Sequence, residues 1–199
     1  EECSPLDGGS LPTRYDLPDN RGFLRDGLHG RVRVIFGMSV STFTTVHVVL
    51  SLIGIAAGLV VLFAAFDAKA PPGWTALFLV TTILTSATGY FFPADRVLPS
   101  HIVGAVSLAA LALAVGALYQ FRLAGAWRWI YVVTAVAALY LNVLVAVAQA
   151  FLKIAPLHDL APTQKEPPFA IAQGIVLLAF IVAGFLAVRR FRPEIEVTA

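Results

Sequence analysis

The sequence predicts an all-α protein, an integral membrane bundle of five transmembrane helices. Of its 199 residues, 58% are hydrophobic and 13% are charged, whereas charged residues make up about 25% of a typical soluble domain. The mean hydropathy is +0.81. Five uncharged stretches of roughly twenty residues follow one another, and each is long enough to cross a bilayer core of roughly 30 Å as a helix.

The predicted membrane domain covers residues 38–190. Residues 1–37 are rich in Gly, Pro, Asp and Arg and show neither helical nor strand periodicity, which predicts a flexible tail. Because the only methionine, Met38, directly precedes the first span, we expect translation to start there; the alternative is a genuine extramembrane segment left after processing. Residues 191–199 form a C-terminal tail, and the spans are expected at about 43–66, 74–92, 101–121, 129–152 and 169–188.

The first two spans are predicted to pack as antiparallel neighbours. Gly54 and Gly58 give the first span a GxxxG spacing, which allows another helix to approach closely. The connection at 67–73 is short, so the second span returns beside the first. Its hydroxyl side chains can bond to carbonyls of their own helix, and the ring of Pro93 ends it.

The last three spans differ in the packing that they predict. Ala112 and Gly116 give the third span a small-xxx-small spacing, so we expect it to pack closely against neighbours. The amide of Asn142 in the fourth span needs partners in hydrocarbon, so we expect it to point into the bundle and bond to another helix. The loop at 153–168 contains four prolines, which predict an extended cover over the end of the bundle at which the first and third spans begin.

Basic residues are distributed unequally between the two membrane faces. The face on which the first span begins carries Arg96, Lys153 and Lys165, whereas the opposite face carries Lys69, Arg122, Arg128, Arg189, Arg190 and Arg192. Because the face of the C-terminus carries six basic residues and the other face three, the sequence predicts a cytoplasmic C-terminus in a bacterial inner membrane. Counting the five basic residues of 1–37 would reverse this to eight against six.

Two histidines mark the first candidate site. His47 and His101 begin parallel spans, so they lie at matching depth on one membrane face, and Gly89 lies near the same level. Two imidazoles that face each other across a bundle can supply both axial ligands of a b-type haem, and Arg96 could pair with a propionate. The alternative is interfacial anchoring, because an imidazole at a helix start can face the headgroups without any cofactor.

This pattern, over about residues 46–121, resembles membrane b-type cytochromes that carry histidines on separate helices. The resemblance implies one haem b, electron transfer and a quinol as redox partner. The chain departs from the diheme pattern, because only one histidine pair is available at helix starts. The chain also resembles uncharacterised small polytopic proteins of the bacterial inner membrane, a resemblance that implies a multi-pass protein and no particular activity.

A second candidate site lies in the loop at 153–168. His158 and Asp159 are adjacent there and return to the face of His47 and His101. Added to the two helix-start histidines, His158 and Asp159, or Asp95 from the earlier loop, would offer nitrogen and oxygen ligands to copper or zinc. No closely spaced ligand motif accompanies them.

The sequence predicts no catalytic residue. It contains no GxSxG, HExxH or Walker-type glycine motif, and no span holds the acidic residue that ion-coupled carriers usually need. A single cysteine excludes an internal disulfide, and scattered basic residues give little support for nucleic-acid binding. We therefore predict a non-catalytic accessory or assembly subunit that packs against other membrane subunits or itself. The alternative is a one-haem cytochrome using His47 and His101.

Overall fold

The structure, a computed structural model, describes residues 34–35, 37–92 and 99–192. The helices are α2 (Val40–Phe66), α3 (Pro72–Thr88), α4 (Pro99–Val115), α5 (Trp127–Lys153), α6 (Ala155–Leu160) and α7 (Pro167–Arg190). A 3-10 turn, η1 (Gly89–Phe91), continues α3, and a π-helical turn, η2 (Gly116–Gln120), continues α4. Five of these helical segments are long and apolar enough to cross a membrane. The predicted all-α class with five spans is confirmed.

A small hairpin precedes the first span, where the sequence predicted no strand. β1 (Val34–Ile35) pairs antiparallel with β2 (Met38–Ser39). Gly37 in the turn has a φ of +78°, a left-handed conformation that glycine adopts without steric cost. The Ser39 hydroxyl then accepts a hydrogen bond from the backbone N–H of Thr42 at 3.1 Å and caps α2. The hairpin therefore crosses the predicted boundary between tail and membrane domain.

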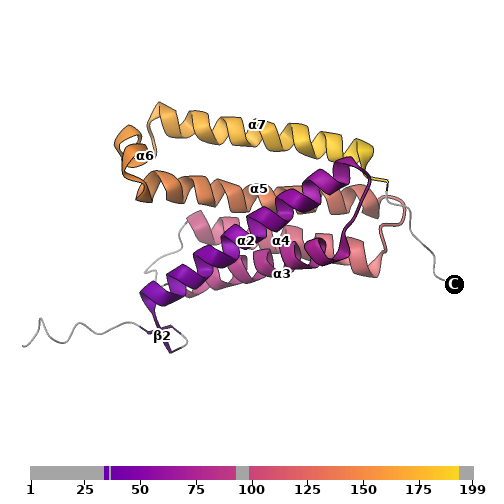
Figure 1. Cartoon of the computed structure of the whole chain (residues 1–199), viewed down its shortest axis with the longest axis horizontal. Helices are drawn as coiled ribbons and strands as arrows, with labels where there is room; N and C mark the ends of the chain where they lie inside the picture. The colour runs from indigo at the N-terminus through magenta and orange to yellow at the C-terminus, as the bar shows by residue number, and fades with distance from the viewer. Residues whose placement is uncertain (1–33, 36, 93–98, 193–199) are drawn as a thin grey trace, which may run out of the picture.

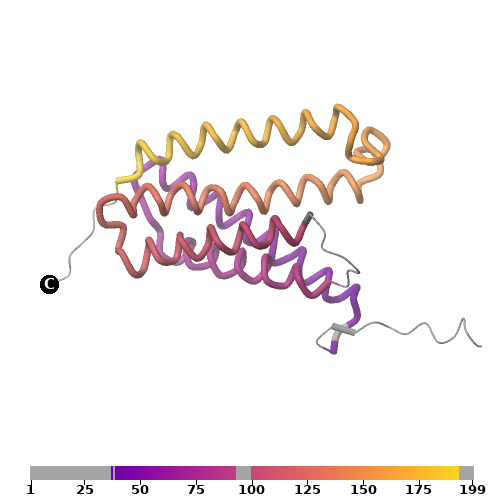
Figure 2. The backbone as a smooth tube through the Cα atoms, turned by 180° about the vertical axis from the view of Figure 1, so that it is seen from behind, coloured from indigo at the N-terminus to yellow at the C-terminus, as the bar shows by residue number. Residues whose placement is uncertain are grey.

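The helices form a packed group of four with a fifth at its edge. α3 and α4 lie side by side, and α5 lies next to α4 (Figure 1). α2 crosses this group diagonally and packs against α3 and α5. In the view turned by 180°, α2 lies behind the other helices (Figure 2). α7 lies along α5 at the edge. Within the most apolar 18-residue stretch of each helix, only 6% of the residues are buried in α7, compared with 33% in α2, α3 and α5.

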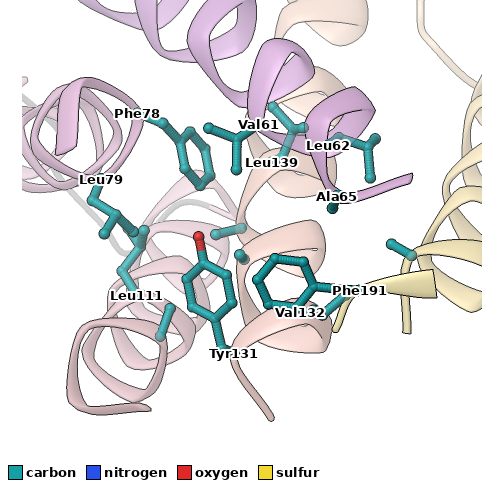
Figure 3. Close-up of a cluster of buried hydrophobic side chains, with 14 of the residues drawn as sticks. Val61, Leu62, Ala65, Phe78, Leu79, Leu111, Tyr131, Val132, Leu139 and Phe191 are labelled. Atoms are coloured by element: carbon teal, nitrogen blue, oxygen red, sulfur yellow. The ribbon is translucent and has the colours of Figure 1, made fainter. Parts of the chain in front are cut away.

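The centre of the bundle is an aromatic and aliphatic core. Phe78 on α3 and Leu111 on α4 are almost fully buried, and Tyr131 reaches toward them from α5 (Figure 3). Gly58 on α2 makes this packing possible, because a Cβ there would lie 2.6 Å from Cδ1 of Leu139 and 2.8 Å from Cδ2 of Phe78. The close helix approach predicted from the GxxxG spacing is therefore confirmed.

The expected close packing at the second small-residue pair is wrong. Ala112 is exposed, and no described atom lies within 4 Å of a Cβ placed on Gly116. The small-xxx-small spacing is the same in both helices, but this face of α4 is turned away from its neighbours. Spacing alone does not show which face of a helix meets a partner.

The connection from α5 to α7 is helical rather than extended. It contains α6, whose first turn holds Pro156, where a missing backbone N–H costs no helical hydrogen bond. Hydrogen bonds then hold α7 to α5 at both ends. Gln173 Nε2 donates to the Leu144 carbonyl at 3.1 Å, and Arg128 Nη1 donates to the Phe191 carbonyl at 2.9 Å. Between these ends, residues of both helices line an apolar groove of about 390 Å³.

Candidate functional site

A cavity of about 100 Å³ lies between α2, α3, α4 and α5, at the end of the bundle where α2 and α4 begin, and both polar and apolar side chains line it. His47, His101 and Gly89 all line it, so the structure brings together these three residues of the first candidate site. Its polar lining also includes Ser51, Thr85, Ser86, Tyr90, Ser107 and Asn142. Arg96 lies outside the described residues.

The imidazole of His47 is held in one orientation by α3. Its Nδ1 lies 2.9 Å from the hydroxyl oxygen of Thr88. That hydroxyl also lies 2.7 Å from the carbonyl of Leu84 and 3.2 Å from that of Thr85, either of which can accept its hydrogen. When the hydroxyl donates to a carbonyl, Thr88 accepts from Nδ1–H and Nε2 is the ring acceptor; in the other tautomer Thr88 donates to Nδ1 and Nε2 carries the hydrogen. The ring of Phe92 packs edge-on against His47 at 5.2 Å between centroids.

His101 is covered by an aromatic ring rather than exposed along α4. The ring of Tyr90 stacks on the imidazole at 5.5 Å between centroids and 20° between planes. The Tyr90 hydroxyl donates to the His101 carbonyl at 2.7 Å. Gly104 allows this arrangement, because a Cβ there would come within 3.2 Å of the Tyr90 ring. The two histidines of the cavity therefore have different surroundings.

Asn142 reaches the cavity from the middle of α5. The side chain is buried, and its Oδ1 accepts a hydrogen bond from the Ser51 hydroxyl of α2 at 2.7 Å. The predicted inward orientation and interhelical hydrogen bond are confirmed. Asn142 Nδ2 and Thr85 Oγ1 are also buried, and neither atom has a hydrogen-bond partner among the described residues.

The cavity does not accommodate a porphyrin in this arrangement of helices. Pockets that hold drug-sized ligands measure roughly 300–1,000 Å³, whereas this cavity measures about 100 Å³. The Tyr90 ring covers one side of the His101 imidazole. Two imidazoles therefore share a cavity here without enclosing a space for haem between them.

The second candidate site remains a prediction without a third ligand. His158 and Asp159 lie on α6, where His158 is half-buried and Asp159 is exposed. Nδ1 of His158 is buried and has no partner in the part of the chain that the structure describes. Across the same ranges, no group of three His, Cys, Asp or Glu side chains could hold a metal ion. Asp95 lies outside the described residues.

Several cavity residues were not singled out from the sequence as parts of a site. Ser51, Tyr90, Gly104 and Ser107 line the cavity beside the two histidines. A signal for two of them is present in the spacing: Ser51 follows His47 by four residues, and Gly104 follows His101 by three. Residues three or four apart lie on one face of a helix. Once a histidine is known to face the cavity, the residues three or four positions after it are therefore expected to face the cavity too.

Comparisons with known proteins identify no family for this chain. No protein-family model, no curated protein and no solved structure matches it. Its composition and structure together establish a multi-pass helical membrane protein with five candidate spans, for which the lipid bilayer is the implied surrounding.

Proposed function

We propose that the protein is a non-catalytic accessory or assembly subunit that binds a partner in the membrane through α7. The low burial of this helix supports the proposal: 6% of its most apolar window is buried, against 22% in α4 and 33% in the other spans. Its outward side chains are large, and those between 54% and 64% exposed are Ile171, Ile175, Leu178, Ile181 and Phe185.

Small residues on α7 provide a place where a partner helix could approach closely. Ala170 and Gly174 are both exposed and have small-xxx-small spacing. No described atom lies within 4 Å of a Cβ placed on Gly174. Since association in lipid depends on close packing rather than on removal of apolar surface from water, such a pair favours a helix as the neighbour. The competing explanation is that α7 faces lipid alone.

Site-specific photo-crosslinking in native membranes tests this proposal. A crosslinker at Leu178 on α7 should capture one discrete protein species. The matched position is Leu113 on α4, which is 51% exposed compared with 63% for Leu178. We expect no discrete protein adduct from Leu113. Lipid adducts alone from both positions, or the same proteins from both, would contradict the proposal.

Two matched substitutions test whether the complex depends on close approach of a partner helix to α7. Gly174→Leu should weaken the complex about tenfold, because the larger side chain separates the helices. Gly116→Leu provides the control, since this glycine also has open space around its Cβ position and lies on a different segment. Native mass spectrometry of complexes extracted in mild detergent measures both. Equal complex formation by the two variants would count against docking through Ala170 and Gly174.

The one-haem cytochrome, with a quinol as redox partner, is the second candidate function. Placement of His47 and His101 on one cavity favours it, and the small volume of that cavity opposes it. Visible spectra of the oxidised and the dithionite-reduced protein, purified from cells supplied with haem, test whether the protein is a cytochrome. A Soret band lost in both His47→Ala and His101→Ala would establish a b-type cytochrome, and a featureless spectrum would reject it.

We also propose a bacterial inner-membrane location with the C-terminus in the cytoplasm. Six basic residues on the C-terminal face against three on the other support this orientation when counting starts at Met38. A green fluorescent protein fused after Ala199 should fluoresce, and alkaline phosphatase at the same position should be inactive. The reverse pattern would place the cavity lined by His47 and His101 at the cytoplasmic face.

A further inference from the structure

The apolar groove between α5 and α7 has walls from both helices. Its lining residues lie between positions 133 and 140 on α5 and between 177 and 188 on α7, and all are aliphatic, aromatic or glycine. The helices approach each other closely at Gly184, where a Cβ would lie 3.3 Å from Cγ1 of Val136. Because apolar walls favour hydrocarbon over water, a hydrocarbon chain is the kind of molecule that fits this groove.

The groove has the length of one membrane leaflet. Its lining on α7 extends from Leu177 to Val188, and a helix rises about 1.5 Å per residue, so this wall is about 17 Å long. Half of a hydrocarbon core of roughly 30 Å is about 15 Å. The Val188 end lies close to the membrane surface, since α7 ends at Arg190. An acyl chain from that leaflet can therefore follow the groove inward from a headgroup at the Val188 end.

Two arginine side chains lie at the same end of α5 and α7. Cζ of Arg189 lies 4.3 Å from the centroid of the Phe185 ring, which is part of the groove lining. Nη1 of Arg128 donates to the Phe191 carbonyl at 2.9 Å, so a second guanidinium lies where the end of α7 meets the start of α5. A guanidinium binds phosphate oxygens through a planar fork of N–H donors. The headgroup that suits this end of the groove is thus anionic.

Other charged side chains surround these two arginines. The described residues at this end of the bundle include the basic residues Lys69, Arg122, Arg190 and Arg192 and the acidic residue Asp67. Glu194 and Glu196 follow in the sequence and lie outside the described residues. Selectivity for an anionic headgroup therefore rests on the two guanidinium groups that contacts place beside the groove, and not on the net charge of this end.

We propose that the groove binds one acyl chain of an anionic phospholipid, whose phosphate is bound by Arg189 and Arg128. Basic side chains between transmembrane helices are a general way of binding anionic headgroups. The site uses the C-terminal half of α7, whereas the small pair Ala170 and Gly174 lies in the N-terminal half. The lipid site does not depend on the partner proposed for that half and can be tested with the purified protein alone.

Native mass spectrometry of the full-length protein tests the headgroup preference. Phosphatidylglycerol and phosphatidylcholine with the same acyl chains are titrated into the protein in detergent. We expect phosphatidylglycerol to bind roughly fivefold more tightly, because only this headgroup has a net charge opposite to that of the arginines. Equal affinities would overturn the proposal, and neutralisation of the arginines by Glu194 and Glu196 would give that result.

Two neighbouring arginines provide a matched pair of variants. Arg189 follows Phe185 of the groove lining by four residues, whereas Arg190 follows Leu186, which is not part of that lining. Arg189→Gln should reduce the preference for phosphatidylglycerol about threefold through loss of the phosphate contact, whereas Arg190→Gln should leave it nearly unchanged. Both side chains are exposed, so both variants should fold. Equal effects of the two substitutions would indicate general surface charge and overturn the proposed site.

Filling the groove tests the binding of the acyl chain. Ala137 lines the groove from α5, whereas Ala112 is exposed on α4 and lies outside it. Ala137→Leu should weaken binding of both phospholipids about fivefold, because its larger side chain takes space that the chain needs. Ala112→Leu should leave binding of both unchanged.

Two results for the Ala137→Leu variant would overturn the proposal, provided that thermal unfolding shows the variant to be folded. The first is lipid binding equal to that of the wild type. The second is loss of protein dimers with lipid adducts unchanged, which would assign the groove to a second copy of the chain.

Discussion

Gly54 and Gly58 lie one turn apart on α2, but they face different surroundings. A Cβ on Gly54 would lie 3.0 Å from the hydroxyl oxygen of Thr82 and within 3.3 Å of two other polar atoms. A Cβ on Gly58 would meet only carbon, at 2.6 Å from Leu139 and 2.8 Å from Phe78. The same motif thus marks the boundary between a polar half of the bundle, next to the cavity, and an apolar half around the aromatic core.

The two halves are stabilised in different ways. In the apolar half, side chains fill the space between helices, so loss or gain of volume should be costly. Unpartnered polar atoms occur in both halves, at Thr82 and Asn142 in the polar half and at Tyr131 in the aromatic core. In the polar half they lie among other polar groups, so some apolar substitutions there should be tolerated or favourable. Substitutions of matched size can therefore test whether the division is real.

The largest expected effect is that of Phe78→Ala in the apolar half. Phe78 is 1% exposed, and its removal leaves a cavity that costs on the order of 3 kcal/mol of unfolding free energy. Phe63→Ala is the control, because Phe63 is 61% exposed and faces away from the core. Unfolding of the two variants in bilayers or mild detergent measures the difference. Equal losses would mean that the core does not determine stability.

Adding a methyl group at each glycine of α2 should separate the two halves. Gly58→Ala forces Phe78 and Leu139 to move and should cost about 1–3 kcal/mol. Gly54→Ala should cost less, because its neighbours are the ends of polar side chains at 3.0–3.3 Å. Gly174→Ala, with open space around the new methyl, should be neutral or slightly stabilising. A larger loss at Gly54 than at Gly58 would contradict the comparison.

Thr82→Val should increase stability by about 1 kcal/mol, because it removes a buried hydroxyl that has no partner while keeping its volume. Ser51→Ala should instead decrease stability by about 1 kcal/mol, since the Ser51 hydroxyl donates to Asn142. Thermal unfolding of both variants distinguishes a polar half with spare hydrogen-bonding groups from one in which every group is used. A loss of stability in Thr82→Val would show that its hydroxyl is paired.

The smallest expected effect is outside the membrane, where polar groups at the same end of the bundle are paired. The Thr163 hydroxyl donates to Glu166 Oε1 at 2.8 Å and holds the pKa of that carboxyl below its ordinary value. This lowered pKa stabilises the loop above the ordinary pKa of glutamate, and the contribution is lost as pH falls through the lowered value. Thr163→Val should raise the Glu166 pKa, which NMR of labelled glutamate measures. An unchanged Glu166 pKa would show that this hydrogen bond is not the main cause of the lowered value.

The spans could be predicted from the sequence because hydropathy and length determine which segments can cross a bilayer. The shared level of His47, Gly89 and His101 also followed from counting antiparallel spans, and all three line one cavity. What the sequence could not reveal is helix rotation. The stacking of Tyr90 on His101 and the exposed face of Ala112 both depend on how neighbouring helices turn about their axes, which hydropathy and residue spacing do not specify.

α7 is bonded to α5 at both ends, while an apolar groove of about 390 Å³ lies between the two helices. The groove is lined almost entirely by apolar atoms, which makes water an unfavourable filling, so we expect hydrocarbon chains of the surrounding bilayer to complete the packing there. Acyl-chain length and order then become structural variables of the protein itself. We expect the protein in a short-chain micelle and the protein in a thick bilayer to differ in what fills this groove as well as in the surrounding solvent.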